Sequence, residues 1–497
     1  MNEQVKQTLL ARVYDVAQET PLQLAHKLSG QLGRQVFLKR EDLQPVHSFK
    51  LRGAYNKIVQ LSDAEKSKGV IAASAGNHAQ GVALSAKKLG ISAIIVMPTT
   101  TPAIKIDAVK SYGAEVILAG GSYSDAYDHS QKLMKSSGRT FIHPFDDPLV
   151  IAGQGTVGRE ILEQLPDVTH IFVPVGGGGL IAGIAQYVKA LRPDIKIIGV
   201  EPEDSNALGK SLKAGRRVAL PHVGIFADGV AVKQVGEHTF KLAQQYVDQV
   251  MTVNTDQICA AIKAVFEDTR SIVEPAGALA TAGIMHYKLP ANAQAVSICS
   301  GANVTFERLQ QIAERTLIGS GKEALFAVTM PERPGALKTF CTDVVKDHSI
   351  TEFGYRLNER SGAHVLVSIS VANTADKAAF MTKMEKHGYG HVDLSRDDIA
   401  KEHTRHMIGG PASAAGHEHL YQIDFPERPG ALGDFLATIG TGWNISAFHY
   451  RHQASDAGNV LIGFEAPDRV TLEARLSKTG YDWHKADTNP SLKLFIQ

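Results

Sequence analysis

The sequence predicts an α/β protein with open, mainly parallel sheets in a two-lobed first domain, followed by two α+β modules. Short apolar runs alternate with amphipathic segments between residues 36 and 301, which is typical of the strands and helices of a parallel sheet. Glycine-rich turns join several of these runs to the helices that follow. A motif that occurs twice after residue 320 predicts the duplicated modules.

The elements of the first domain follow one another as strand–helix units. Strands are expected at residues 36–38, 70–73, 93–98, 115–118, 170–175, 196–201 and 295–299. Helices are expected at residues 79–89, 105–112 and 123–136, and from residue 180. Ligands of such sheets bind beyond the carboxyl ends of the strands. The turns at residues 74–78, 176–179 and 300 are therefore the expected places for a site.

Composition and charge argue against several classes of protein. The 497 residues carry a net charge of +1 and three widely separated cysteines. This charge does not favour nucleic acid or an anionic membrane, and the cysteines form neither a disulfide framework nor a metal site. Acidic residues interrupt the apolar positions of residues 1–22, so we expect a helix there, with Val5, Leu9, Val13 and Val16 on one face, and not a signal peptide. The protein is expected to be cytoplasmic and to hold no metal.

Lys50 is the residue around which the first domain is organised. It follows a strand, a charged turn and Pro45, and it begins a segment in which Leu51, Ala54 and Ile58 recur at helical spacing. A lysine at a helix N-terminus is unfavourable for the helix dipole. A nearby anionic ligand would compensate for this cost, as would use of the amine in a Schiff base. The alternative is an ordinary solvated lysine.

Four consecutive glycines, Gly176, Gly177, Gly178 and Gly179, lie between an expected strand and an expected helix. Without Cβ atoms the backbone can turn tightly and present several N–H groups to a phosphate. A purely structural turn is one alternative. A dinucleotide site is another, because the spacing also fits G-x-G-x-x-A and Glu201 ends the next strand. No Gly-Lys-Ser/Thr follows, which argues against a P-loop.

The turn at residues 74–78 reads Ser-Ala-Gly-Asn-His. Its backbone N–H groups suit a carboxylate, and the amide of Asn77 suits a phenolic oxygen on a bound ring. His78 by itself is more often a structural residue. Ser300 follows an apolar strand, and this hydroxyl or Asn303 could instead cap the next helix.

Taken together, these stretches resemble the pyridoxal-phosphate-dependent threonine and serine dehydratases, of the tryptophan-synthase-β-like fold group. The resemblance rests on residues 48–54 (SFKLRGA), 74–81 (SAGNHAQG), 153–156 (GQGT) and 176–180 (GGGGL), and it extends from about residue 20 to residue 308. It makes the dinucleotide interpretation the weaker one.

The resemblance also implies roles for individual residues. Lys50 would carry pyridoxal 5'-phosphate, and Asn77 and Ser300 would contact its ring hydroxyl and ring nitrogen. Cofactor contacts are implied for Phe49, Gly176, Gly177, Gly178, Gly179 and Leu180. Substrate contacts are implied for Ser74, Ala75, Gly76 and His78. Racemases of the family carry a serine where this chain has Ala75, which counts against racemisation.

The rest of the chain contains the repeat. Residues 326–337 match residues 421–432, and residues 353–356 match residues 448–451, both at an offset of 95. Each copy is expected to form a strand, a Pro-Gly turn, a helix, two strands, a helix and a strand. The copies resemble the ACT-like regulatory domains of biosynthetic threonine dehydratases. Tyr355 and Tyr450 occupy matching places and are expected to bind effectors; packing of the module core, or oligomerisation alone, are the alternatives. His417 and His419 have a metal-like spacing, but a linker at residues 409–419 is favoured.

These expectations combine into one hypothesis. Residues 1–320 would form the catalytic domain, and residues 324–397 and 418–490 the two regulatory modules. The family dehydrates and deaminates L-threonine to 2-oxobutanoate and ammonia, with isoleucine as inhibitor, valine as activator and a homotetrameric assembly. A serine/threonine dehydratase of broader role, a β-replacement enzyme of the same fold and an inactive amino-acid sensor are the alternatives.

Overall fold

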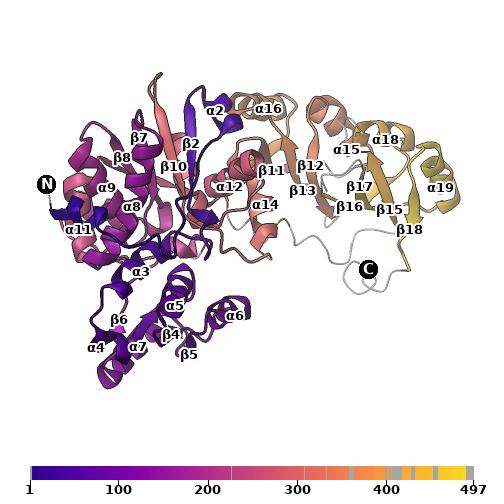
Figure 1. Cartoon of the computed structure of the whole chain (residues 1–497). Coiled ribbons are helices and arrows are strands. Elements are labelled where there is room, and N and C mark those ends of the chain that lie inside the picture. The colour runs from indigo at the N-terminus through magenta and orange to yellow at the C-terminus, as the bar shows by residue number, and fades with distance from the viewer. Residues whose placement is uncertain are drawn as a thin grey trace. The chain divides into compact units, whose positions relative to one another are not determined.

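The computed structural model divides the chain into two compact units, Met1–Thr316 and Leu317–Gln497. The structure describes residues 3–488 except residues 225, 307, 332, 357–362, 398–399, 402–404, 406–416, 427–430 and 452–456. The first unit has a larger and a smaller lobe, and the second unit is built on one long sheet (Figure 1).

The larger lobe contains a six-stranded sheet in the order β1-β2-β10-β7-β8-β9. All neighbouring pairs are parallel except β1 with β2. Its strands are β1 (Leu22–Leu24), β2 (Gln35–Arg40), β7 (His170–Pro174), β8 (Lys196–Pro202), β9 (Gln249–Val253) and β10 (Gln294–Cys299). Its helices are α1 (Glu3–Leu9), α2 (His26–Leu32), α8 (Pro148–Gln164), α9 (Gly179–Leu191), α10 (Ala207–Ala214), α11 (Glu237–Tyr246), α12 (Thr255–Thr269), α13 (Pro275–His286) and α14 (Arg308–Gly319).

Both faces of this sheet are covered by helices. Successive side chains of a strand point to opposite faces. Phe172 of β7 therefore packs with residues of α12 and α13, whereas its neighbours Ile171 and Val173 pack with residues of α8 and α9. A strand buried on both faces reads as a continuous apolar run, which explains why β7 and β10 could be recognised in the sequence.

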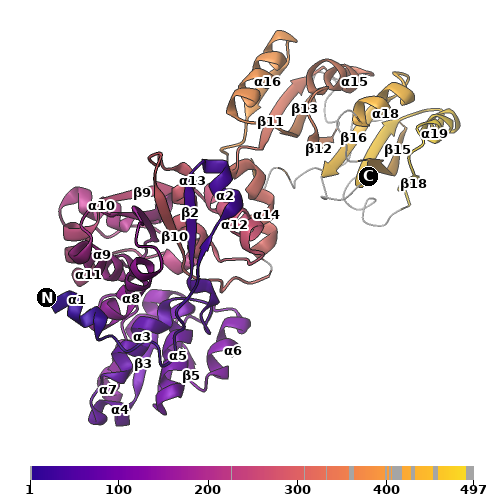
Figure 2. The ribbon, with the colours of Figure 1, turned by 45° about the horizontal axis from the view of Figure 1, so that its top comes forward.

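The smaller lobe contains a four-stranded parallel sheet in the order β5-β4-β3-β6 (Figure 2). Its strands are β3 (Val70–Ala73), β4 (Ala93–Met97), β5 (Glu115–Leu118) and β6 (Thr140–Phe141). Its helices are α4 (Asp63–Lys68), α5 (Asn77–Leu89), α6 (Ala103–Ser111) and α7 (Tyr123–Ser137), and α3 (Lys50–Val59) packs on both α5 and α8. Helix α3 thus connects the lobes.

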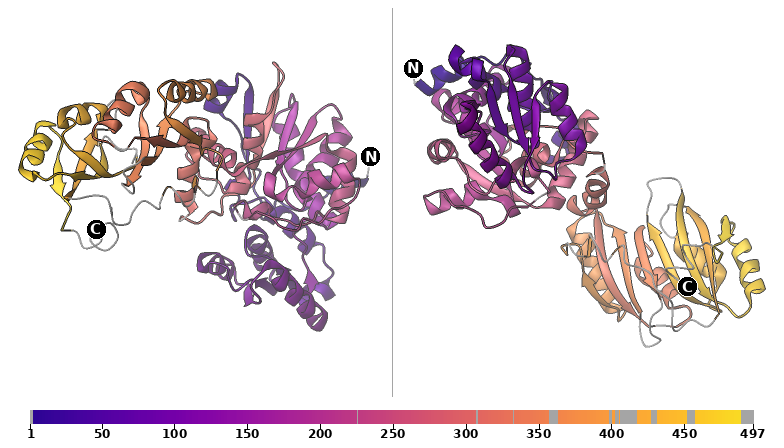
Figure 3. Two further views of the ribbon diagram at one scale, coloured as in Figure 1. Left: turned by 180° about the vertical axis from the view of Figure 1, so that it is seen from behind. Right: turned by 90° about the horizontal axis from the view of Figure 1, so that it is seen from below.

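The second unit contains an eight-stranded antiparallel sheet in the order β14-β11-β13-β12-β16-β17-β15-β18. Its strands are β11 (Glu323–Met330), β12 (Ile350–Arg356), β13 (Ala363–Ser370), β14 (Gly390–Asp393), β15 (Glu418–Pro426), β16 (Asn444–Arg451), β17 (Ala457–Glu465) and β18 (Trp483–Lys485). Its helices are α15 (Ala336–Phe340), extended by a turn of π-helix (Cys341–Val345), and α16 (Thr374–Lys386), α18 (Ala431–Ile439) and α19 (Arg469–Lys478). The four helices lie on one side of the sheet (Figures 2 and 3).

This order is symmetric about the junction of β12 and β16. Gly354 of β12 lies opposite His449 of β16, and these two residues are themselves related by the offset of 95. The two modules therefore pair edge to edge through β12 and β16, and a pseudo-two-fold axis at this pair relates one module to the other. One hydrophobic cluster runs through both modules and includes Phe353 and its counterpart Phe448. These two rings pack edge to face, with their centroids 5.1 Å apart.

The expected fold class is confirmed, and the expected order of strands and helices is found in both modules. The expected Pro-Gly turn of the second module falls on residues 427–430, outside the described part. Two local expectations were wrong. The first helix ends at Leu9, and residues 10–22 contain turns, because Val5 and Val13 are buried in different clusters that one straight helix cannot reach. The expected linker overlaps β15: Glu418 is its first residue and binds Arg356 and the Ser446 hydroxyl. Residues 409–416 lie outside the described part.

Candidate functional site

Lys50 is the first residue of α3, as the sequence predicts. The preceding segment is hydrogen-bonded to the residues that follow β10. Ser48 forms an antiparallel bridge with Gly301, and the Phe49 N–H donates to the Ser300 carbonyl at 3.2 Å. Two stretches about 250 residues apart in sequence therefore meet at the carboxyl edge of the larger sheet.

The Lys50 amine is half-buried and points towards a single carbonyl. Its Nζ donates to the carbonyl oxygen of Pro144 at 2.9 Å and lies 5.3 Å from the centre of the Phe49 ring. Burial lowers the pKa of the Lys50 ammonium to about 8, although the charge of Glu274 opposes the shift. An amine with such a pKa is partly neutral near physiological pH, which both imine formation and proton abstraction require.

The four glycines connect β7 to α9. Gly178, the N-cap residue of α9, has a φ of 93°, which a residue with a side chain rarely adopts. A Cβ on Gly177 would lie 2.2 Å from the Phe145 ring, and one on Gly179 would lie 3.0 Å from the Phe145 backbone. Only glycine fits this close approach. The first N–H groups of α9 lack intrahelical acceptors, so the loop forms an anion-binding cradle.

Residues 143–147 connect this cradle to Lys50. Pro144 accepts the bond from the Lys50 amine, and the next residue, Phe145, covers the glycines. Asp146 then caps α11 by accepting bonds from the N–H groups of Glu237 and His238 at 2.8 Å. The amine and the anion cradle are therefore held on one short segment that is itself anchored to a helix.

Asn77 begins α5 at the carboxyl end of β3. Its Nδ2 donates to Glu274 Oε1 at 2.6 Å, and its Oδ1 accepts a bond from Asn303 Nδ2 at 2.6 Å. A Cβ on Gly301 would lie 2.6 Å from that Glu274 oxygen and 3.2 Å from Asn77 Nδ2. Asn77 therefore lies next to the Ser300–Gly301 turn.

Ser300 and His78 have different surroundings. The Ser300 hydroxyl is buried and donates to the Ala276 carbonyl at 3.3 Å, a long bond that can be exchanged for a ligand acceptor. The His78 ring is also buried, and its Nε2 lies 2.8 Å from the Ile142 carbonyl oxygen. Burial and the charge of Lys50 lower the pKa of His78 to about 3. This ring is held by a structural hydrogen bond, which gives little support to the expected substrate contact.

The remaining expected substrate residues, Ser74, Ala75 and Gly76, form the turn between β3 and α5. The Gly76 N–H donates to the Ser74 hydroxyl at 3.3 Å. This turn precedes a helix N-terminus, where backbone N–H groups and the helix dipole favour a carboxylate.

A buried charge network fixes the start of α3 two residues after Lys50. The Arg52 guanidinium binds Glu41 at 2.7 Å and Glu160 at 2.5 Å, and Lys39 binds Glu160 at 2.6 Å. All four side chains are essentially inaccessible to solvent. Two cations and two carboxylates compensate one another, and removing any one would leave an unpaired buried charge.

Sequence reasoning missed four residues of this site: Glu274, Asn303 as a partner of Asn77, Pro144 and Phe145. None carries a local signal for its role. Asn303 was expected at most to cap a helix, whereas its amide donates to the Val46 carbonyl and to Asn77. Glu274 precedes Pro275 and reads as an ordinary residue at a helix start.

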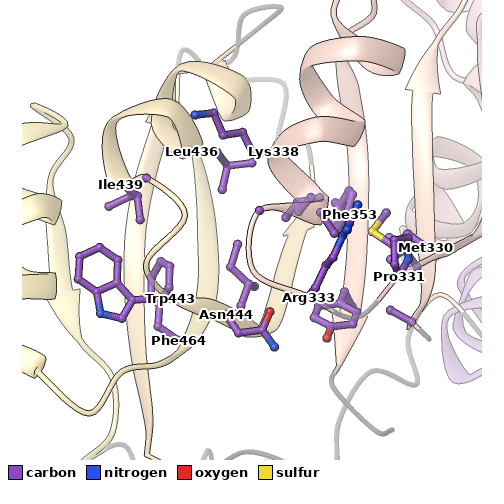
Figure 4. A pocket seen from close by; sticks show the side chains of 18 residues that line it. Met330, Pro331, Arg333, Lys338, Phe353, Leu436, Ile439, Trp443, Asn444 and Phe464 are labelled. Carbon is purple, nitrogen blue, oxygen red and sulfur yellow. The ribbon is translucent and has the colours of Figure 1, made fainter. Parts of the chain in front are cut away.

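The second unit has two cavities, one beside each of the matching tyrosines. The Tyr355 cavity has a volume of about 40 Å³ and is lined by the Pro-Gly turn of the first module and the end of α18 (Figure 4). The Tyr450 cavity has a volume of about 200 Å³ and is lined by the start of α18 and the segment before β12. Most lining positions of one cavity correspond to those of the other at the offset of 95, so the pseudo-two-fold axis relates the two cavities.

Comparison with known proteins identifies the same family that the sequence motifs resemble. Residues 13–301 match the family model described as pyridoxal-phosphate dependent enzyme, and residues 314–404 and 409–496 match the C-terminal regulatory domain of threonine dehydratase. The L-threonine dehydratase biosynthetic IlvA of Burkholderia multivorans is 51% identical, over 100% of this chain and 99% of that protein. The chain belongs to the biosynthetic threonine dehydratases. It is a pyridoxal-phosphate-dependent enzyme.

Two further relatives support the family assignment. The L-threonine dehydratase biosynthetic IlvA of Escherichia coli is 48% identical, over 99% of this chain and 97% of that protein. The processed form of threonine deaminase isoform 2 from Solanum lycopersicum has a solved structure that is 51% identical and has a TM-score of 0.62; the match covers 63% of this chain and 92% of that one.

The residues present fit the cofactor. The glycine cradle, which a Cβ would obstruct, suits a phosphate, and a half-buried amine of lowered pKa lies on the same short segment. The Asn77 amide and the Ser300 hydroxyl supply neutral polar groups for a ring. Among the described residues, no group of three or more His, Cys, Asp or Glu side chains could hold a metal ion. No described helix is long and apolar enough to cross a membrane.

Proposed function

We propose that this enzyme dehydrates and deaminates L-threonine to 2-oxobutanoate and ammonia, as the committed and feedback-controlled step towards isoleucine. The observation that carries the proposal is the combination, in one chain, of the Lys50 site with a duplicated regulatory unit. That combination extends over the full length of relatives named as biosynthetic threonine dehydratases. A β-replacement enzyme of the same fold would not be expected to carry it.

Within the site, each residue has a distinct task. Pyridoxal phosphate, when bound, withdraws electrons from the substrate Cα. Lys50 would hold the cofactor, and its amine, which is partly neutral near pH 8, would accept the Cα proton. The glycines from Gly176 to Gly179, with Leu180, hold the phosphate through backbone N–H groups. Phe49 packs beside the amine.

The two ring contacts determine which reaction follows. Asn77 would donate to the ring hydroxyl, and Ser300 would donate to the ring nitrogen. A neutral hydroxyl does not keep that nitrogen protonated as a carboxylate would. Negative charge at the substrate Cα is then stabilised less, so early loss of the β-hydroxyl is favoured over transamination or racemisation.

The turn of Ser74, Ala75 and Gly76 holds the substrate carboxylate through its backbone N–H groups. Because the side chain of Ala75 is a methyl group, it cannot deliver a proton to the second face of Cα. This further disfavours racemisation.

We also propose that the two cavities of the regulatory unit bind branched-chain amino acids, isoleucine as inhibitor and valine as activator. Each cavity joins an apolar wall to a cation and a tyrosine: Arg333 with Tyr355, and Lys346 with Tyr450. A cation suits the ligand carboxylate, and a phenol offers both an apolar face and a hydroxyl. A homotetramer in the cytoplasm is proposed from the family resemblance.

The test is a turnover assay with purified protein. Ketoacid should form from L-threonine without an added thiol, and isoleucine should inhibit its release. Turnover that requires a thiol would indicate β-replacement. A protein that binds isoleucine but releases no ketoacid would be a sensor without activity. The domain boundaries at residues 320, 324, 397, 418 and 490 remain predictions, which limited proteolysis can test.

A further inference from the structure

Glu274 is the N-cap residue of α13 but does not cap that helix with its side chain. A carboxylate at this position would ordinarily accept bonds from the first N–H groups of the helix. Here Oε1 accepts a bond from Asn77 Nδ2, which belongs to the other lobe and lies 197 residues away in the sequence. The side chain is thus directed into the cofactor site.

The position of this carboxylate is energetically unfavourable. Glu274 is only 4% exposed and accepts hydrogen bonds from the Asn77 amide and the Asn303 backbone N–H, but no lysine or arginine of the described residues forms an ion pair with it. Burial, together with the charge of Asp228 on the nearby 3-10 helix (Asp228–Val230), raises the pKa of Glu274 to about 7, although its two hydrogen bonds and the charge of Lys105, which pairs with Asp228, oppose the shift. A buried carboxylate without a cationic partner costs stability even when it is hydrogen-bonded, so its presence at this point favours a role in the site.

The hydrogen bonds of Asn77 indicate that role. Above about pH 7, where Glu274 is ionised, its carboxylate only accepts hydrogen bonds, so the end of the amide that faces it must be the NH₂ group. The carbonyl end is then left for Asn303, whose Nδ2 donates to Asn77 Oδ1 at 2.6 Å and to the Val46 carbonyl at 2.9 Å. With both ends bound, the amide cannot turn over, and its second N–H is left for a ligand.

We propose that Glu274 is a positioning residue for the cofactor ring: it orients the Asn77 amide so that an N–H, and never the carbonyl oxygen, faces the ring hydroxyl. An N–H donor stabilises this oxygen in its deprotonated form, whereas a carbonyl would stabilise the protonated form. The inference rests on the proposed contact between Asn77 and the ring hydroxyl. Glu274 does not itself touch the ring in this proposal: it acts on the Asn77 amide, from its position at the start of α13.

The experiment is a pH titration of the absorbance of the holoenzyme without substrate, which reports the protonation of the Lys50–cofactor linkage. It compares the parent with E274Q, N303A and N77A, and with E203Q, an exposed glutamate outside the site, as the matched control. Glutamine at position 274 can either accept from or donate to Asn77, so the charged acceptor that fixes the amide is lost and only the bond from Asn303 remains. We expect the titration midpoint of E274Q to rise by about one pH unit, a tenfold change in proton affinity.

The sign of the shift separates positioning from simple electrostatics. Loss of a negative charge alone would favour the deprotonated ring oxygen and would lower the midpoint. N303A removes no charge and leaves Glu274 bound to the NH₂ group of Asn77, so its midpoint should stay near that of the parent. We further expect the affinity of the apoenzyme for pyridoxal phosphate to fall by about tenfold in E274Q, as for the loss of one hydrogen bond, and to stay unchanged in E203Q.

The outcomes are distinct. A midpoint that falls or stays in E274Q, while that of N77A rises, overturns the inference and leaves the function intact. An unchanged midpoint in N77A removes the proposed ring contact and the inference with it, although ketoacid release would still test the function. If E274Q does not fold, N303A decides: a midpoint that rises as far in N303A as in N77A would mean that Asn303, and not Glu274, fixes the amide, and overturns the inference.

Discussion

The catalytic unit and the regulatory unit differ in how their sites are assembled. In the catalytic unit every site residue occurs once, and residues such as Lys50, Asn77 and Ser300 come from different strand ends that long-range hydrogen bonds bring together. In the regulatory unit each element occurs twice around the Gly354–His449 pair. A site that occurs once has no second copy to replace a lost residue, whereas two copies of a site can come to differ in how strongly they bind a ligand. Substitutions should therefore act in an all-or-none way in the first unit and in a graded way in the second.

The largest effect is expected for Lys50→Ala. The substitution removes both the covalent anchor and the base, so turnover of threonine should fall by at least about a thousandfold. The cofactor should bind only non-covalently, which borohydride reduction followed by mass spectrometry will show as the absence of a reduced adduct.

Lys110→Ala is the matched control, because Lys110 is an exposed lysine in the last turn of α6. It should retain parental turnover and form the adduct. Substantial activity in Lys50→Ala would show that another group supplies the base and would contradict the assignment of the site.

A smaller but still large effect is expected for Ser300→Asp. A carboxylate would keep the ring nitrogen protonated and stabilise negative charge at the substrate Cα for longer. Dehydration should slow by about a hundredfold, in line with a changed charge-assisted hydrogen bond, and the share of transamination products should increase. The products can be separated by chromatography. Ser300→Ala should keep the parental product ratio, and equal product ratios in Ser300→Asp and Ser300→Ala would argue against the contact with the ring nitrogen.

The parts of the fold that the sequence predicts are those encoded locally. Strands β3, β4 and β5 were placed to within one residue, because apolar runs between glycine or proline turns have few other structures available. The first helix was overextended for the opposite reason. Its apolar spacing continues past Leu9, but the partners of Val13 are Val46 and Leu51, which only the tertiary structure brings near.

The residues of the candidate site also differ in whether the local sequence indicates their role. The glycine cradle and Lys50 could be proposed from the sequence because a strand-to-helix turn and a helix-start lysine leave a signal in neighbouring residues. Glu274 and Phe145 could not be found, since each acts on a residue far away in sequence, Asn77 and Gly177 respectively. Both roles also depend on where the two lobes meet, which no periodicity encodes.

Within the regulatory unit, Tyr450→Ala should have the larger effect of the two tyrosine variants. Tyr450 lines the cavity of about 200 Å³, which has room for an amino acid without rearrangement. Effector control usually involves 1–3 kcal/mol of coupling. Losing part of it should raise the isoleucine concentration for half inhibition by about tenfold while basal turnover stays near that of the parent. Lower basal turnover together with earlier unfolding would instead make Tyr450 a core residue.

Tyr355→Ala should have the smallest effect, about two- to threefold in the same assay, equivalent to well under 1 kcal/mol of coupling. The reason is the difference between the two cavities. Trp443 and Lys338 line the Tyr355 cavity where the Tyr450 cavity has the smaller His348 and Gly433, and only about 40 Å³ remains. Because an amino acid cannot enter so small a space without moving these side chains, binding there must first displace them, and the measured coupling is correspondingly weaker. The double variant Trp443→His, Lys338→Gly gives this cavity the residues of its counterpart at these two positions. If the small volume causes the weak effect of Tyr355→Ala, this variant should bind a second equivalent of isoleucine in calorimetry. Tyr355→Ala placed in that background should then raise the isoleucine concentration for half inhibition by about tenfold. One equivalent in both the parent and the double variant would show that the second copy has lost the ligand contacts themselves and serves only to hold the sheet together.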